Sequence, residues 1–236
     1  RRRGSRGLPS LARLAVHWLR CALFAARDTL SIGWLSLRFR TELRRLMREP
    51  AQVIMKTWCA APPSPDEAAD FYYGTLPQQL GERGVRCLVL CGDAQSRLEA
   101  GFTRAVLRRK QPRGVPECLL VPVWAPLAIA WKQLTAAFAL RRLAARASDG
   151  RFFAVCGAAC LGSLQPITLR NALYYYIART AVRAWGAKVF ITFYEGQPWE
   201  QPAWLGAKAA DPACVTVGYQ HTVVLPSNRS LLQSQD

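Results

Sequence analysis

Two carboxylates, Glu195 and Glu200, stand close together in the stretch FITFYEGQPWEQPAW at residues 190–204. The chain has only 15 acidic residues against 32 basic ones, so two neighbouring acids call for an explanation. A carboxylate held beside a substrate hydroxyl can accept its proton during a reaction. Glu195 directly follows an apolar, β-prone run, and we therefore predict it as a general base.

The second candidate base is His221, one of only two histidines in the chain. It follows the apolar run CVTVGY, in the order Gly-Tyr-Gln-His. Histidine titrates near neutral pH, so it can accept a proton or donate to a phosphate or sugar hydroxyl. Aromatic residues surround both candidate bases, and aromatic faces can stack against the C–H groups of a sugar. The residues predicted to bind substrate are Tyr194, Trp199, Glu200, Tyr219 and Gln220.

Each of these residues also has a purely structural explanation. Pro198 suits the first position of a helix, with Gln197 as its cap. Glu200 would then be the third helical residue, where a glutamate can bond back to the cap and interact favourably with the helix dipole. Glu195 would be a solvated or arginine-paired carboxylate. A single histidine is commonly a bystander, and aromatic clusters commonly belong to the core.

From residue 51 onward, short apolar runs alternate with helix-like segments. The predicted strands are 51–57, 86–91, 117–123, 151–156, 187–194 and 214–219, and the predicted helices are 66–81, 94–110, 125–147, 166–185 and 198–210. This alternation is typical of an α/β fold with a mostly parallel sheet covered on both faces. We predict a Rossmann-like doubly wound domain over residues 51–236. Glu195 and His221 would lie at the carboxyl ends of its strands, where such sheets bind ligands.

Residues 1–50 are predicted as a separate basic segment with helices at 8–30 and 34–48. An arginine recurs every seven residues, which places one row along a helix face: Arg6, Arg13, Arg20 and Arg27. Trp18 and Leu23 lie elsewhere around the same helix. A basic helix of this kind can lie flat on an anionic membrane. It can equally pack on the domain and leave its arginines in solvent.

The formal net charge of +17 favours an anionic partner, namely lipid, nucleic acid or a phosphorylated substrate. The eight cysteines follow no disulfide or zinc spacing, so we predict reduced core residues and no metal site. The absence of a GxGxxG or Walker motif disfavours a simple dehydrogenase or P-loop enzyme. The best uncharged run, 152–169, is interpreted as a strand and loop and not as a membrane span.

The stretch FITFYEGQPWEQPAWLGAKAADPACVTVGYQHTVV resembles a segment of bacterial surface-carbohydrate glycosyltransferases of the GT-B type, which build O-antigen or capsule. In that family a YEG/E-x-x-WE stretch follows a strand, and a helix and a strand ending in GYQH come next. The stretch DFYYGTLPQQLGERGVRCLVL at residues 70–90 also resembles their first strand-to-strand crossover. The resemblance extends loosely over residues 66–225 and closely over 189–222. Glu195, Glu200 and His221 match its polar positions.

This resemblance implies an acceptor-side Rossmann-like domain followed by a second domain that grips the sugar nucleotide. No second domain follows before Asp236, so further sequence or a partner would supply it, or the chain is inactive alone. The implied reaction is attack by an acceptor hydroxyl on the anomeric carbon of a nucleotide-sugar, without a metal or other cofactor. The acceptor would be lipid-linked or a polysaccharide, and the protein peripheral at the cytoplasmic face of the inner membrane.

Two other functions are compatible with the sequence. The charge would suit a nucleic-acid-binding protein, although no known binding motif is evident. A non-catalytic scaffold at the membrane would keep the fold and lack the chemistry. Salt-dependent nucleic-acid binding would support the first alternative.

Overall fold

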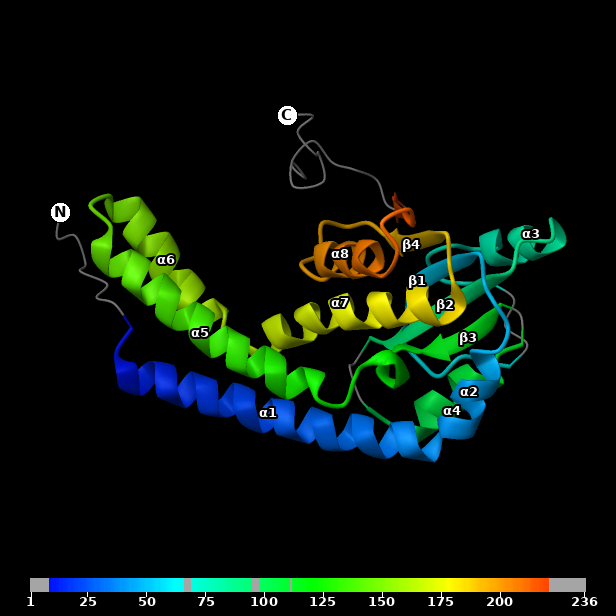
Figure 1. Ribbon diagram of the computed structural model, residues 1–236, viewed down its shortest axis with the longest axis horizontal. Coiled ribbons are helices and arrows are strands. Elements are labelled where there is room, and N and C mark those ends of the chain that lie inside the picture. Colours follow the sequence, from blue (N-terminus) through cyan, green and yellow to red (C-terminus); the bar gives the residue numbers. More distant parts are fainter. Residues whose placement is uncertain (1–8, 66–68, 95–97, 111, 221–236) are drawn as a thin grey trace. The chain divides into compact units, whose positions relative to one another are not determined.

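The computed structural model describes residues 9–65, 69–94, 98–110 and 112–220 (Figure 1). It has a mixed α/β fold in which helices flank a five-stranded parallel sheet, and this confirms the predicted fold class. The chain divides into two compact units. The first comprises residues 1–30 and 123–173, and the second comprises 31–122 and 174–236. The proposed boundary at residue 50 stays a prediction.

The sheet belongs to the second unit. Its strands are β1 (Val53–Cys59), β2 (Cys87–Asp93), β3 (Arg113–Pro116), β4 (Val189–Phe193) and β5 (Val215–Tyr219). They lie in the order β3-β2-β1-β4-β5, and every neighbouring pair is parallel. All the strands therefore end at one side of the sheet, here called the carboxyl edge. The strand order reverses between β1 and β4, which is where open α/β sheets characteristically bind ligands.

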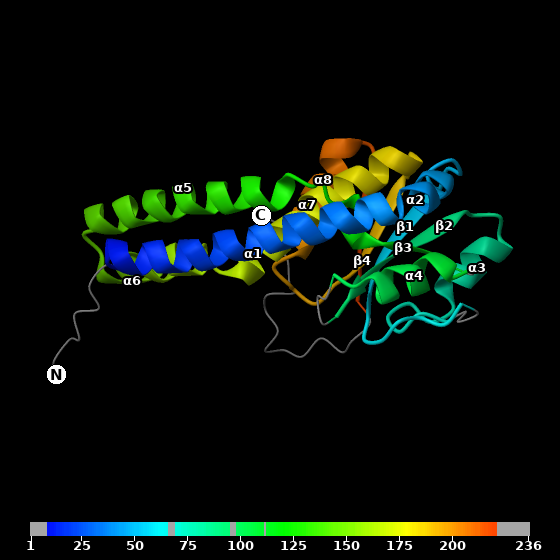
Figure 2. The same ribbon diagram turned by 90° about the horizontal axis from the view of Figure 1, so that it is seen from below.

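Helices cover both faces of this sheet. Helices α3 (Leu76–Glu82) and α4 (Ala100–Arg108) lie on one side, and α8 (Glu200–Ala210) lies on the other with the second part of α7 (Pro166–Trp185) (Figure 2). The central strands are accordingly buried on both faces, as continuous apolar runs require. Fully buried examples are Ile54, Met55, Val89, Leu90 and Phe190.

The first unit is helical. It contains most of α1 (Leu11–Arg38), together with α5 (Ala125–Arg146), α6 (Gly150–Gly162) and the start of α7. Its small core joins Leu14, Ala137 and Cys160 from α1, α5 and α6 with Leu164, which lies between α6 and α7. Within the second unit, the end of α1 and α2 (Arg40–Leu46) pack near the short 3-10 helix η1 (Glu117–Leu120) through Leu35, Phe39, Leu43 and Leu119.

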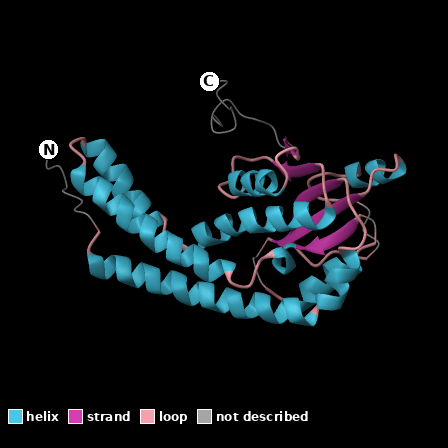
Figure 3. Ribbon diagram, viewed as in Figure 1, coloured by secondary structure: helices cyan, strands magenta, loops and turns pink. Residues whose placement is uncertain are grey.

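The predicted strand at 151–156 is wrong, because this segment belongs to α6 (Figure 3). A short apolar run has no periodicity that separates a buried strand from a buried helix. Here the Asp149 side chain caps the helix by accepting from the Arg151 N–H at 2.9 Å. Cys156 and Cys160, four residues apart, then become the buried stripe of the helix.

Two further element predictions need correction. The strand predicted at 117–123 lies earlier, at Arg113–Pro116, and Glu117–Leu120 is a 3-10 helix. A strand that contains both Gly114 and Pro116 suits the sheet edge that β3 occupies. The helix predicted at 66–81 is present only at Leu76–Glu82, and residues 66–68 lie outside the described ranges.

The two predicted N-terminal helices, 8–30 and 34–48, are mainly one helix, Leu11–Arg38, followed by the short α2. One side of α1 is buried, with Leu14, Cys21, Ala25 and Ile32 almost inaccessible. Trp18 packs against the core on this side, so it does not belong to an outward face. Among the described helices, none alone is long and apolar enough to cross a bilayer, although the bent pair α6 and α7 together meets those two criteria.

Candidate functional site

The carboxyl edge brings together most of the residues that the sequence singles out. Tyr194 and Glu195 directly follow β4, while Tyr219 ends β5 and Gln220 follows it. The Tyr194 N–H donates to the Tyr219 carbonyl oxygen at 2.9 Å, which fixes the two strand exits side by side. His221 lies outside the described residues, so its position relative to Glu195 stays a prediction.

A buried hydrogen bond shapes the loop that carries Glu195. Helix α8 begins at Glu200, two residues later than predicted, and Glu200 is only 2% exposed. Its Oε1 accepts from the Glu195 N–H at 2.8 Å, and the carboxylate also bonds the N–H groups of Gly196 and Gln197. Gly196 has φ +72°, a left-handed conformation that lets the chain turn back over this carboxylate. Glu200 therefore positions the Glu195 loop. The predicted cap at Gln197 is wrong, because the residue before the helix is Trp199 and Glu200 is the first helical residue.

Burial raises the pKa of the Glu200 carboxyl above its ordinary 4.5, and the three backbone N–H groups oppose this shift only in part. A raised folded-state pKa contributes stability that is fully present below pH 4.5 and is lost as the pH rises through the folded value. As the pH rises from 4.5 through the folded-state pKa, we expect the free energy of unfolding of the wild type to fall relative to that of Glu200→Gln. Urea unfolding of both proteins across the acid range measures it, and parallel curves would contradict the assignment.

Aromatic rings line the carboxyl edge. The Tyr72 ring stacks on Phe193 with centroids 4.0 Å apart, and the nearby charge of Glu195 adds to burial in raising the pKa of the Tyr72 hydroxyl. Tyr219 is 38% exposed, and its ring lies 5.5 Å from that of Tyr73. Tyr219 therefore offers ring surface at the end of β5, and Tyr72 lies near Glu195. Tyr72 was missed in the sequence because it lies far from residue 195 along the chain.

Trp199 and Tyr194, both predicted to bind substrate, differ in their surroundings. Trp199 is 4% exposed, and its ring lies 5.1 Å from Phe193 and 5.0 Å from Tyr174. It is thus a core residue beneath the edge. Tyr194 is half-buried, with its ring 5.6 Å from that of Trp204.

The sequence analysis missed a buried ion pair on the same face of the sheet as Trp199. Lys56, in the middle of β1, is 1% exposed, and its Nζ lies 3.2 Å from Oε2 of Glu117. The Tyr174 hydroxyl donates to the other oxygen of Glu117 at 2.8 Å. Lys56 Nζ also donates to the Thr57 carbonyl at 2.6 Å and lies 3.6 Å from the centre of the Trp58 ring. A signal was present, because a lysine inside the apolar strand VIMKTW must find a partner when buried.

The ion pair is built into the carboxyl edge. Glu117 directly follows β3, and its carboxylate lies over Gly92 of β2, where an added Cβ would approach Oε1 to 2.6 Å. Burial lowers the pKa of the Lys56 ammonium, and the charge of Glu117 acts in the opposite direction. A buried lysine whose pKa is lowered by burial, held by a carboxylate at a ligand-binding edge, is a common feature of functional sites.

A second buried network lies on the opposite face of β1. The Asp70 carboxylate accepts from the Thr57 hydroxyl at 2.9 Å and lies 3.7 Å from the Arg109 guanidinium. The Tyr73 hydroxyl donates to the Lys56 carbonyl oxygen at 2.7 Å. These contacts hold the segment after β1 against the carboxyl half of that strand.

Cysteines contribute thiols to the same region but form no disulfide among the described residues. Cys59 ends β1, and a hydrogen bond with Cys91 lowers the pKa of its thiol, with support from the charge of Lys56. The same contact and burial raise the pKa of Cys91. The described His, Cys, Asp and Glu side chains form no group of three or more that could hold a metal ion.

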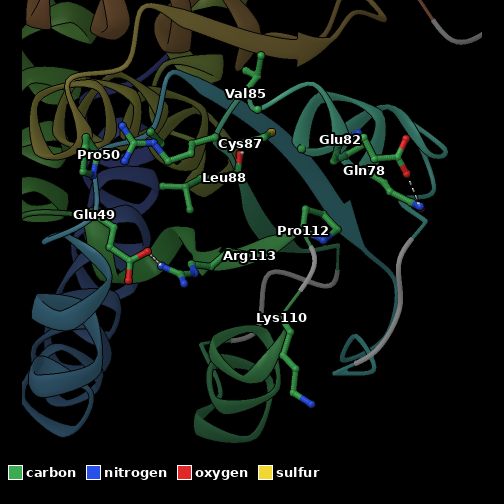
Figure 4. Close-up of a pocket in the computed structure, with 15 residues that line it drawn as sticks. Glu49, Pro50, Gln78, Glu82, Val85, Cys87, Leu88, Lys110, Pro112 and Arg113 are labelled. Carbon is green, nitrogen blue, oxygen red and sulfur yellow. Dashed lines mark hydrogen bonds and ion pairs between the residues drawn. The ribbon is translucent and has the colours of Figure 1, made fainter.

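A cavity of about 530 Å³ lies at the opposite end of the sheet, where β1, β2 and β3 begin (Figure 4). Both carboxylates that line it have partners: Glu49 forms an ion pair with Arg113, and Glu82 accepts from Gln78 at 2.9 Å. Val85 and Leu88 also line it. The Cys87 thiol also lines it, and burial raises the pKa of this thiol to about 12. The carboxyl edge, with its buried Lys56–Glu117 ion pair, is the stronger candidate site.

No protein-family model, curated protein or solved structure matches this chain.

Proposed function

We propose that this chain is the acceptor-side, Rossmann-like half of a GT-B-type glycosyltransferase that uses a nucleotide-sugar to extend a lipid-linked or polysaccharide acceptor. The observation that carries the proposal is the position of Glu195. It follows β4, next to the reversal of strand order, on a loop that Glu200 holds from beneath. The resemblance of residues 189–222 to surface-carbohydrate glycosyltransferases supplies the reaction class.

In the proposed reaction, an acceptor hydroxyl oxygen attacks the anomeric carbon of the donor sugar. Glu195 takes the hydroxyl proton as the new glycosidic bond forms, and the nucleotide diphosphate leaves with the electrons of the broken bond. A general base of this kind must lie within hydrogen-bond reach of the proton that it removes. Glu195 is half-buried, which leaves part of its side chain open to a ligand.

The aromatic rings at the edge support a sugar-bearing acceptor as the ligand. Tyr219 presents ring surface at the end of β5, and Tyr72 lies near Glu195. Sugar C–H groups pack on such rings, while the hydroxyl groups bond to carboxylates and amides. In this proposal Tyr219 and Gln220 contact the acceptor, and Trp199 supports the loop from the core.

Acceptor binding can be tested on the full chain without turnover. The probe is a water-soluble, short-chain polyprenyl-diphosphate sugar, and its binding is measured by saturation-transfer NMR. We expect saturable binding that Tyr219→Ala weakens about two- to tenfold, since an aromatic contact of this type is worth about 0.5–1.5 kcal/mol.

The matched control is Val215→Ala, at the amino end of the same strand and 54% exposed. It should leave the affinity unchanged. The proposal fails if the probe does not bind saturably, or if Tyr219→Ala and Val215→Ala bind it equally well.

A further inference from the structure

Helix α1 has two apolar faces, and only one of them is covered. The covered face includes Leu14, Cys21, Ala25, Ile32 and Leu35, all at most 2% exposed. Leu14 packs against α5 and α6 residues, and the Cys21 thiol donates to Gln133 Oε1 at 3.0 Å. These contacts fix the rotation of the helix about its own axis and so determine which residues point outward.

The uncovered face carries a row of large apolar side chains. Val16, Leu23, Leu30 and Leu37 recur every seven residues, close to two helical turns, and are 56%, 63%, 75% and 75% exposed. Leu19 and Trp34 fall on the same face and are 54% and 55% exposed. These six side chains are here called the outer stripe. They lie roughly opposite the covered face, so nothing in the described part of the chain buries them.

Positive charge borders the outer stripe along one side. Arg13, Arg20 and Arg27 share its seven-residue spacing, and all three are exposed. The one acidic residue of α1, Asp28, is 2% exposed and lies 3.1 Å from Arg27 and 3.9 Å from Arg170. Helix α1 therefore presents apolar and cationic groups on its exposed surface without an exposed carboxylate.

We propose that the outer stripe of α1 docks in the plane of an anionic lipid bilayer, with Arg13 and Arg20 at the level of the lipid headgroups. An interfacial helix buries its apolar face at the boundary between headgroups and acyl chains, and basic residues at its border are attracted to anionic lipids. The arrangement differs from the sequence expectation in one respect. Trp18 faces the protein core, while Leu23 and Trp34 face the membrane.

The charges argue against a second copy of the chain as the occupant of this face. Two such helices could bury their stripes against each other in either direction. Each would bring its arginine row to the contact, and neither offers an exposed acidic residue to pair with it. Like charges beside a helical seam oppose pairing. An anionic bilayer satisfies the apolar stripe and the arginines together.

The test uses the full chain and flotation with phosphatidylcholine vesicles that either contain or lack phosphatidylglycerol. The wild type should float with the anionic vesicles and much less with the neutral ones. Leu23→Glu combined with Leu30→Glu should reduce partitioning about 100-fold, because two apolar anchors are lost. Arg13→Gln combined with Arg20→Gln should reduce it about 10- to 30-fold on anionic vesicles only.

Leu205→Glu is the matched control, because this leucine is 58% exposed on a different helix, α8. It should float like the wild type. Circular dichroism confirms that each variant is folded. If the Leu23/Leu30 variant floats like the wild type, or if the wild type binds both vesicle types equally, the proposal is wrong.

Two further measurements identify the occupant. Brominated lipids should quench the emission of the wild type more than that of Trp34→Phe, and equal quenching would contradict insertion of this face. Sedimentation velocity should give the same mass for the wild type and the Leu23/Leu30 variant in the absence of lipid. A wild-type dimer that becomes monomeric in this variant would assign the stripe to self-association and overturn the proposal.

Discussion

Replacing Glu195 with glutamine is expected to reduce sugar transfer about 100- to 10,000-fold, because loss of a general base typically has an effect of this size. Glutamine keeps the shape and hydrogen-bonding capacity of the side chain but cannot accept the acceptor proton. The Glu195 N–H that bonds Glu200 belongs to the backbone, so the substitution leaves the loop contact in place. The loss should therefore fall on turnover, with the fold and the acceptor affinity retained.

Glu200→Gln is the matched control, five residues away in the same loop. A glutamine oxygen can still accept from the Glu195 N–H, so only the carboxylate's charge at the start of α8 is lost. Because the loop contact is kept, the barrier to sugar transfer should change by no more than about 1 kcal/mol, which is about fivefold in rate. The two variants are compared by the rate at which labelled sugar is transferred to the acceptor, in an assay that contains the nucleotide-sugar binding domain. Normal turnover in Glu195→Gln with none in Glu200→Gln would reverse the assigned roles.

The largest effect on stability is expected at the buried ion pair of Lys56 and Glu117. Lys56→Met leaves the Glu117 carboxylate beside Tyr174 without its cation, and Glu117→Gln leaves the ammonium without its anion. Removing one partner of a buried pair typically lowers the free energy of unfolding by about 3–5 kcal/mol. Each single variant should therefore be strongly destabilised.

The double variant Lys56→Met/Glu117→Gln should recover much of this loss, because replacing both charges often costs little. Its glutamine can still accept from the Tyr174 hydroxyl, which keeps that donor satisfied. Urea unfolding of the four proteins gives the coupling energy between the two residues. If the losses of unfolding free energy in the two single variants simply add in the double variant, Lys56 and Glu117 are not coupled and the prediction is wrong.

The sequence by itself determined the α/β class and the placement of the Glu195 loop. A strand buried on both faces must be apolar throughout, and a helix must bury only one stripe, so their alternation is visible in the residue pattern. The same reasoning placed α7 at residues 166–185, which are its bounds in the structure. It also placed Glu195 after a buried strand, although the strand predicted at 187–194 ends one residue earlier in the structure, at Phe193.

Only the tertiary structure decided contacts between residues that are far apart along the chain. Segment 151–156 is apolar enough for a strand, and its packing within the helical unit made it part of α6. Lys56 pairs with Glu117 because β1 and the end of β3 are brought to one edge of the sheet, a proximity that no local pattern encodes. The outer stripe of α1 likewise became identifiable only when packing fixed the rotation of the helix, because the helix is apolar on both sides and its sequence does not say which side is covered.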